Sequence, residues 1–305
     1  MEQFLRFADE VADARRSGTP IVALETTILS HGMPYPQNLE TAREVERIVR
    51  EAGATPATIA VLDGAIHVGL SDERLTRVAR EPMLKLSSAD LAYAISSGKS
   101  GATTVAATMR CASLAGIEVF ATGGIGGVHR GAEQTMDVSG DLEALATTPV
   151  TVICAGAKAI LDLPKTLEAL ETRGVPVIGY GIDEFPAFWS RSSGLPLSLR
   201  VDSPEDAARL IRTHYALGFE TGIVIANPIP VRDEIPRAEM EGFIRAAIAE
   251  TDTANVHGKA LTPWLLDRIL TLSGGRSLEA NIALVRSNAR LAAAIALSCF
   301  RNSNP

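Results

Sequence analysis

The sequence predicts an α/β protein, with a mainly parallel sheet in an α/β/α arrangement and one large domain over residues 1–305. Short apolar runs alternate with longer amphipathic stretches almost to the C-terminus, which is typical of parallel strands joined by crossover helices. Aromatic residues make up only 5% of the chain, whereas small residues are abundant. Small residues let helices pack closely on a parallel sheet.

Six short apolar runs are the predicted strands, and apolar residues recur at helical spacing between them. In chain order the strands are residues 21–24, 58–62, 117–121, 150–155, 175–180 and 222–226. The predicted helices are residues 1–18, 38–52, 102–115, 166–173, 204–217 and 277–296. Ser203 followed by Pro204, and later Ser277, are residue types that favour a helix start.

The composition limits the partners and the compartment. A net charge of −7 argues against a nucleic-acid polymer or an anionic membrane surface, because either requires a basic face. Cys111, Cys154 and Cys299 show no CxxC spacing and are expected to be buried thiols in a reducing compartment. No apolar run of membrane-spanning length is evident. We therefore expect a cytoplasmic protein without a membrane partner.

The richest segment for chemistry is 121–162, which begins ATGGIGGVHRGAEQTMDVSGDLEAL. Its glycines allow backbone N–H groups to approach an anion closely. Asp137 and Asp141 suit a hard divalent ion held partly by water, whereas zinc is disfavoured because the five histidines lack ligand spacing. Asp137, Ser139 and Asp141 are also residue types that cap a helix, so at least one of them is expected to do only that.

Glu25 ends an apolar strand, where a buried carboxylate is costly unless it has a partner or a function. Burial would raise its pKa and suit it to general acid catalysis. The alternative is an ion pair with a structural arginine. The loop that follows, with His31 and Asn38, is longer and more polar than a minimal turn, which favours a binding loop.

A second polar segment combines Lys85 with the later run GKSGATT. Thr103 and Thr104 entering a helix offer free N–H groups and hydroxyls to an anion. The glycine that a Walker motif requires before its Gly-Lys-Ser is missing, so ATP binding there is not expected. An ordinary capped helix explains the pattern equally well.

Lys158 follows a turn of small residues after a predicted strand, near the expected start of a helix. Desolvation and the helix dipole would both lower its pKa, as an imine-forming lysine requires. The alternative is a lysine that extends along the surface to solvent. Asn227 and Asn281 could each contact a polar substrate or only cap a turn.

Several motifs together resemble the pseudouridine-5'-phosphate glycosidase family. They are ALETTILSHGMPYPQN, GATTVAATM, ATGGIGGVHRGAE, DVSGDL, CAGAKAILD, GVPVIGYGIDEFPAFW, ANPIP and TPWLL with SLEANIALVRSNA. The resemblance extends from about residue 21 to about residue 296 and includes no fused sugar-kinase domain. Gly140 stands where the family usually has alanine between Ser139 and Asp141, and Met136 stands where it usually has phenylalanine before Asp137.

The resemblance implies reversible cleavage of the C–C glycosidic bond of pseudouridine 5'-phosphate to uracil and ribose 5-phosphate. It implies that Glu25 is the proton donor, that Lys158 forms a Schiff base with the opened ribose, and that Asp137 ligates a water-rich Mn²⁺. It also implies a homotrimer of α/β/α subunits. The positions it assigns to substrate binding are Lys85, Thr104, Val105, Thr122, His129, Ser139, Gly140, Asp141 and Asn281.

Two other readings remain open at this stage. One is a Schiff-base lyase, aldolase or C-glycosidase that acts on another phosphosugar with the same lysine and phosphate site. The other is a non-catalytic sugar-phosphate-binding protein, which would have no reason to form an imine.

Overall fold

A computed structural model describes residues 2–251, 256 and 258–301. Its centre is an 11-stranded sheet with the strand order β1-β4-β3-β2-β7-β8-β11-β9-β10, and β6 joins it through β3. Most neighbouring strands are parallel, while β3 pairs with β4 and with β6 in the antiparallel sense. The predicted α/β class and mainly parallel sheet are confirmed.

All six predicted strands are present, with small changes of bounds. They are β2 (Ile21–Leu24), β3 (Thr55–Leu62), β7 (Val119–Ala121), β8 (Thr151–Cys154), β9 (Val177–Tyr180) and β11 (Ile223–Ala226). Five short strands at the sheet margins were not predicted. They are β1 (Leu5–Phe7), β4 (Ala65–Val68), β5 (Leu84–Leu86), β6 (Gly101–Thr103) and β10 (Arg200–Val201).

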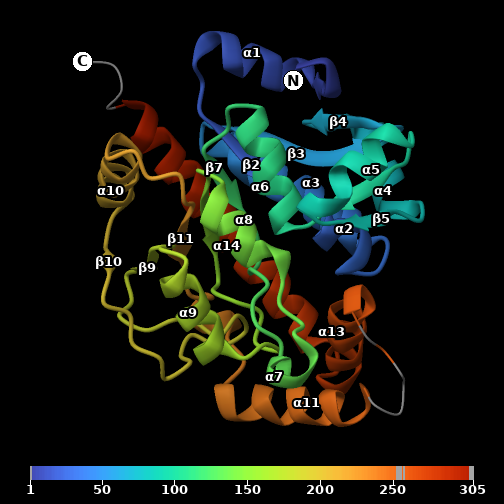
Figure 1. The fold of residues 1–305 in the computed structure, drawn as a ribbon, viewed down its shortest axis with the longest axis vertical. Helices are drawn as coiled ribbons and strands as arrows, with labels where there is room; N and C mark the ends of the chain where they lie inside the picture. Colours follow the sequence, from blue (N-terminus) through green and yellow to red (C-terminus); the bar gives the residue numbers. More distant parts are fainter. Residues whose placement is uncertain (1, 252–255, 257, 302–305) are drawn as a thin grey trace.

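Helices cover both faces of the sheet (Figure 1). On one face lie α3 (Gln37–Glu51), α10 (Pro204–Ala216) and α14 (Arg276–Arg301). The other face carries α6 (Val105–Leu114), α8 (Gly140–Thr147) and α9 (Leu163–Thr172). The shorter helices are α1 (Asp9–Ser17), α2 (Thr27–His31), α4 (Asp72–Arg80), α5 (Leu91–Ser96) and α7 (Ala132–Thr135).

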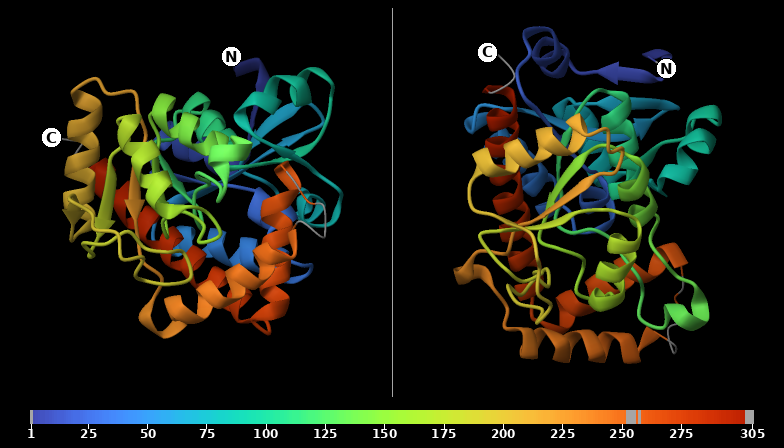
Figure 2. Two further views of the ribbon diagram at one scale, coloured as in Figure 1. Left: turned by 60° about the horizontal axis from the view of Figure 1, so that its bottom comes forward. Right: turned by 60° about the vertical axis from the view of Figure 1, so that its left-hand side comes forward.

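The last helices meet at one end of the sheet. There α11 (Arg237–Ala249) packs against α13 (Leu261–Leu272), and α14 then runs back along the sheet (Figures 1 and 2). By length and composition α14 qualifies as a membrane span, contrary to the expectation from the sequence. However, 56% of its most apolar stretch is buried inside the molecule, where the helix packs on β2, β7 and β8. Its apolar character is therefore that of a core helix.

Three predicted helices were wrong at their starts, and one of them, α9, begins at Leu163 instead of Thr166. Residues 2–7 form a 3-10 turn and β1, so α1 starts only at Asp9. The helix predicted from residue 102 begins at Val105, because Gly101–Thr103 form strand β6 and Thr104 is the N-cap. A side chain at Gly101 would meet Leu86 Cγ at 2.6 Å, so only glycine lets β5 and β6 approach this closely.

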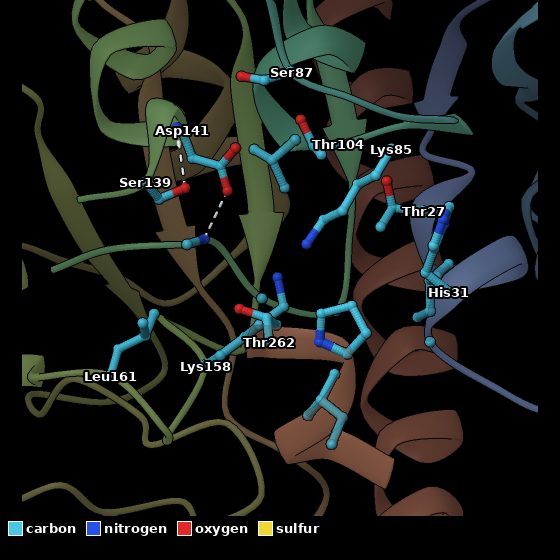
Figure 3. A pocket seen from close by; sticks show the side chains of 18 of the residues that line it. Thr27, His31, Lys85, Ser87, Thr104, Ser139, Asp141, Lys158, Leu161 and Thr262 are labelled. Carbon is cyan, nitrogen blue, oxygen red and sulfur yellow. Dashed lines mark hydrogen bonds between the residues drawn. The ribbon is translucent and has the colours of Figure 1, made fainter. Parts of the chain in front are cut away.

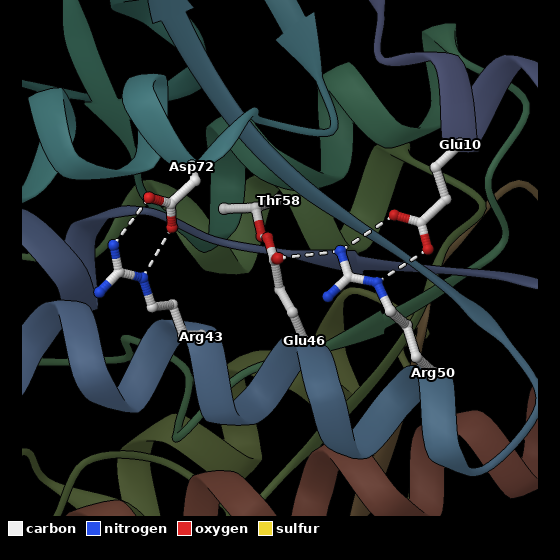
Figure 4. A network of polar contacts seen from close by, with 6 residues as sticks. All are labelled: Glu10, Arg43, Glu46, Arg50, Thr58 and Asp72. Carbon is white, nitrogen blue, oxygen red and sulfur yellow. Dashed lines mark hydrogen bonds and ion pairs between the residues drawn. The ribbon is translucent and has the colours of Figure 1, made fainter.

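A polar network holds α3 in place (Figure 4). The buried Glu46 accepts a 2.6 Å hydrogen bond from Thr58 Oγ1 on β3 and a 3.1 Å bond from Arg50. Arg50 also forms a two-pronged pair with Glu10 on α1. Burial raises the pKa of Glu46 despite these partners. The network ties α3 to α1 and to β3, and β3 pairs with β2, the strand that precedes Glu25.

Candidate active site

The carboxyl ends of β2, β7 and β8 open on a cavity of about 350 Å³. Clefts outside the carboxyl ends of parallel strands are the usual ligand sites of α/β folds. Of the predicted site residues, Glu25, Lys85, Thr104, Val105, His129, Asp137, Ser139, Gly140, Asp141, Lys158 and Asn281 line it. Segments far apart in the sequence therefore meet at one cavity.

Glu25 follows β2 and faces this cavity. One of its carboxyl oxygens accepts a hydrogen bond from the hydroxyl of Thr122, which follows β7. No arginine forms a hydrogen bond or an ion pair with it among the described residues, so the alternative of a structural ion pair is wrong. Burial raises the pKa of Glu25, and the Lys158 ammonium and the Thr122 hydroxyl only partly oppose that effect. The carboxyl is therefore disposed to hold a proton.

Thr122 differs from the other predicted residues in its position. It lies behind Glu25, on the wall of a smaller cavity of about 40 Å³, and does not line the main one. Its hydroxyl reaches Glu25, so its direct structural role is to orient and hydrogen-bond that carboxyl.

Lys158 lies in a loop after β8, and its side chain enters the cavity, as Lys85 does from another side (Figure 3). Its backbone N–H donates to Ile125 O at 3.1 Å, and its carbonyl accepts from Leu161 N at 3.0 Å. Gly156, two residues earlier, has φ +81°, and a Cβ there would meet Pro186 O at 2.3 Å. No helix begins at Lys158, because α9 starts at Leu163. The expected helix start was wrong, but the loop fixes the lysine backbone.

The N-terminus of α6 opens on the same cavity. Thr104 caps it, and its hydroxyl accepts from Ala107 N at 3.4 Å. Thr103 was also expected to face an anion, but its buried hydroxyl donates to Ile59 O at 2.7 Å, within the fold. Lys85 on β5 adds a cationic side chain to the cavity lining. A helix N-terminus with hydroxyls and a cation nearby is a favourable phosphate environment.

Asp141 connects the N-terminus of α6 to the loop that contains Gly126. Its two carboxylate oxygens accept hydrogen bonds from Ala106 N at 2.9 Å and from Gly126 N at 2.8 Å, and the residue is buried. Ser139 caps α8 and accepts from Asp141 N at 3.2 Å (Figure 3). A Cβ at Gly126 would lie 2.2 Å from Ser139 Oγ, so the loop closes this tightly only with glycine. Asp141 thus positions the walls of the cavity.

Asp137 and His129 lie together at the cavity. His129 Nδ1 is 3.9 Å from Asp137 Oδ2, and the backbones are bonded through His129 N and Asp137 O at 3.1 Å. Burial lowers the pKa of His129, aided by Lys85 and Lys158 and opposed by Asp137. Among the described residues no group of three or more His, Cys, Asp or Glu side chains could hold a metal ion. Asp137 offers a partly exposed, hard carboxylate.

The two asparagines singled out from the sequence have different positions. Asn281 reaches the cavity from α14, and its side-chain oxygen is buried without a hydrogen-bond partner among the described residues. Asn227 donates to Ser287 Oγ at 3.1 Å and Asn288 Oδ1 at 2.9 Å, so it ties β11 to α14 and lies outside the cavity.

Other lining residues lie in the family motifs but were given no individual role from the sequence. They include Thr27, Leu161, Phe188, Thr262, Pro263 and Leu266, while Ser87 lies outside those motifs. Phe188 has φ 58°, which is strained for a bulky residue, and its ring lies against Gly124. His31, expected only as part of a binding loop, also lines the cavity, and its pKa is lowered chiefly by burial.

The chain is similar to known proteins over almost its full length. The family model described as indigoidine synthase A like protein matches residues 10–298. The chain is 59% identical over 304 residues to a pseudouridine-5'-phosphate glycosidase of Methylobacterium nodulans, covering 99% of this chain and 90% of that one. It is 60% identical over 293 residues to the protein of that name from Solibacter usitatus, covering 96% and 98%.

Two solved structures share the fold. The crystal structure of the prealnumycin C-glycosynthase in complex with ribulose 5-phosphate has a TM-score of 0.91 and 38% identity, covering 99% of both chains. An indigoidine synthase A-like protein of Thermotoga maritima has a TM-score of 0.90 and 35% identity, covering 98% and 97%. Matches of this length and identity confirm the resemblance found in the sequence. The chain is an enzyme of the indigoidine synthase A-like family, the family to which the pseudouridine-5'-phosphate glycosidases belong.

Proposed function

We propose that this enzyme reversibly cleaves the C–C glycosidic bond of pseudouridine 5'-phosphate, giving uracil and ribose 5-phosphate. The names of relatives at 59% and 60% identity support the substrate, and the C-glycosynthase neighbour supports C-glycoside chemistry. The observation that carries the proposal is the meeting of Lys158 with Glu25, a partly buried carboxyl whose pKa is raised by desolvation, in one cavity.

A carbon–carbon glycoside limits the possible mechanisms. In an ordinary nucleoside the base is bonded to C1' through nitrogen, and protonation of the base helps that bond to break. In pseudouridine the uracil is bonded to C1' through carbon, so protonation of a leaving nitrogen cannot help. An oxocarbenium route with two carboxylates would expel a poor carbanion. A covalent link from an amine to C1' removes this difficulty, because the nitrogen lone pair can push the base out.

In the proposed sequence, the neutral amine of Lys158 attacks C1' of the ribose. The bond from C1' to the ring oxygen breaks, and Glu25 gives its proton to that oxygen. The Lys158 nitrogen, positively charged after the attack, gives a proton to the Glu25 carboxylate, and Glu25 passes that proton to C5 of uracil. The C1'–C5 bond then breaks, and the nitrogen lone pair forms an iminium at C1'. Water adds to the iminium and releases open-chain ribose 5-phosphate and the Lys158 amine. Overall, one molecule of water is consumed for each C–C glycosidic bond cleaved.

The proposed phosphate end is the wall where α6 begins. Lys85, the Thr104 hydroxyl and the Val105 N–H supply charge and donors, and Ser139 and Gly140 at the start of α8 line the same cavity. His129 belongs to the same lining. Binding energy from the phosphate, remote from the breaking bond, would position the ribose over Lys158.

The donor set also fits one hard, largely hydrated divalent ion, for which we propose Mn²⁺. Asp137 offers a single partly exposed carboxylate, and no thiol lines the cavity among the described residues. When bound, such an ion would polarise substrate oxygens through its waters. A cytoplasmic location and assembly as a homotrimer are further proposals, and the mass of the protein in solution tests the assembly.

The test is incubation with pseudouridine 5'-phosphate and Mn²⁺, with uracil release followed by its absorbance or by chromatography. Wild-type protein should release uracil and ribose 5-phosphate in equal amounts, and the reverse mixture should form the nucleotide. No uracil from wild-type protein would contradict the proposal. Turnover of a different C-glycoside with the same lysine would favour the alternative of another phosphosugar substrate.

A further inference from the structure

Two adjacent threonines after β2 are used in opposite ways. The Thr26 hydroxyl is fully buried, donates to Ile59 O at 2.8 Å and accepts from Thr103 N at 2.9 Å. The Thr27 hydroxyl is also buried, yet it has no hydrogen-bond partner among the described residues. Thr27 lines the main cavity. One hydroxyl therefore holds the fold together, and the other faces the site without a partner.

An unpartnered buried hydroxyl loses its bonds to water without replacement, so it lowers stability. Four buried side-chain polar atoms lack a hydrogen-bond partner among the described residues, and they belong to Thr27, Asn281, Arg268 and Arg286, although the Arg268 atom lies in an ion pair with Glu250. Only Thr27 and Asn281 of these line the cavity. A hydroxyl can donate and an amide oxygen accepts, so together they present complementary groups to a ligand.

The position of Thr27 indicates which part of a ligand it meets. Thr27 and His31 lie on one side of the cavity, and Ser139 and Asp141 lie on the opposite side (Figure 3). The second side includes the helix starts that suit a phosphate. His31 and Asn281 also line an adjoining cavity with Leu266 and Pro263, so Asn281 belongs to the Thr27 end. The end of the cavity lined by Thr27 and Asn281 is therefore available to the base.

We infer that Thr27 is a specificity-determining residue that donates a hydrogen bond to a carbonyl oxygen of the pyrimidine ring. Asn281 accepts from a ring N–H beside it. Uracil alternates carbonyl and N–H groups along its edge, which matches one donor and one acceptor. The inference rests on the proposed function, and it adds the residue that reads the base.

Stability provides the first test, independent of substrate. Thr27→Val keeps the shape of the side chain and removes only an unpartnered hydroxyl, so its melting temperature should equal or exceed that of wild type. Thr26→Val, the matched control, leaves buried partners unsatisfied and should melt lower. A lower melting temperature for Thr27→Val would show that the fold uses this hydroxyl, and the inference would be overturned.

Kinetics in the direction of synthesis provides the second test, because uracil and ribose 5-phosphate are then separate substrates. Thr27→Val should raise the KM for uracil about tenfold, the loss expected for one hydrogen bond, and leave the KM for ribose 5-phosphate within about twofold. Thr27→Ser, which keeps the hydroxyl, should restore most of the loss.

The outcomes separate this inference from the proposed function. Wild-type protein that makes no nucleotide refutes the proposed function, and the melting temperatures still decide whether the Thr27 hydroxyl is unused by the fold. With an active wild type, an unchanged KM for uracil refutes the role of Thr27. A rise confined to the KM for ribose 5-phosphate, or equal rises in both, refutes it as well.

Discussion

The hydrogen bond from Thr122 to Glu25 gives a quantitative prediction. Thr122 lowers the pKa of Glu25 by donating to the carboxyl, while burial raises it. Hydrogen bonds to charged groups contribute about 1.5–3 kcal/mol, and one pKa unit corresponds to about 1.4 kcal/mol. Thr122→Val should therefore raise the pKa of Glu25 further, by about 1–2 units.

The direction of the expected change in the pH dependence follows from the role proposed for Glu25. A general acid works only while protonated, so kcat/KM should fall as pH rises through its pKa. In Thr122→Val this decline should move to higher pH by about 1–2 units. The assay is the pH dependence of kcat/KM for uracil release. A buried threonine on β8 supplies the control, since Thr151→Val should leave the profile in place. A decline that stays fixed or moves to lower pH would refute the reasoning.

Three further predictions concern charge, metal and phosphate. Glu25→Gln should abolish uracil release yet raise the melting temperature. The raised pKa of Glu25 means that its ionised form lowers the stability of the folded state. The gain in melting temperature should therefore be absent near pH 4 and grow as the pH rises above 4.5, the pKa of the unfolded state. Chelator should reduce activity, with Mn²⁺ restoring it better than Zn²⁺; full activity of metal-free protein would contradict the role given to Asp137. Lys85→Ala should reduce kcat/KM for the nucleotide by about 10–100-fold and affect the free nucleoside less. Equal losses on both substrates would place Lys85 away from the phosphate.

The sequence predicted the framework of the fold because the central strands are strongly apolar. Strands such as β8 and β11 are buried throughout and bounded by helical patterns, so periodicity identifies them. The marginal strands β5 and β6 were missed because each has only three residues, and their pairing depends on tertiary contact at Gly101. The three-residue strand β7 was found only because it ends a longer run that begins at Ile117.

Much of the site could be predicted, since its residues stand at strand ends and in motifs typical of the family. Glu25 and Lys158 are of this kind. Other features depend on contacts between distant segments that no spacing reveals. Asp141 bonds both Ala106 and Gly126, and Thr27 is distinguished from Thr26 only by what surrounds each hydroxyl. The positive φ of Phe188 is likewise imposed by its surroundings.

The central claim is that Lys158 forms a covalent bond to C1' of the substrate. Borohydride added during turnover of pseudouridine 5'-phosphate would reduce an iminium to a stable amine. Mass spectrometry of the digested protein should then find the mass of a reduced ribose 5-phosphate adduct on the peptide containing Lys158, and Lys158→Arg should show neither adduct nor turnover. Uracil release by wild-type protein without any adduct at Lys158, or release by Lys158→Arg, would contradict the account.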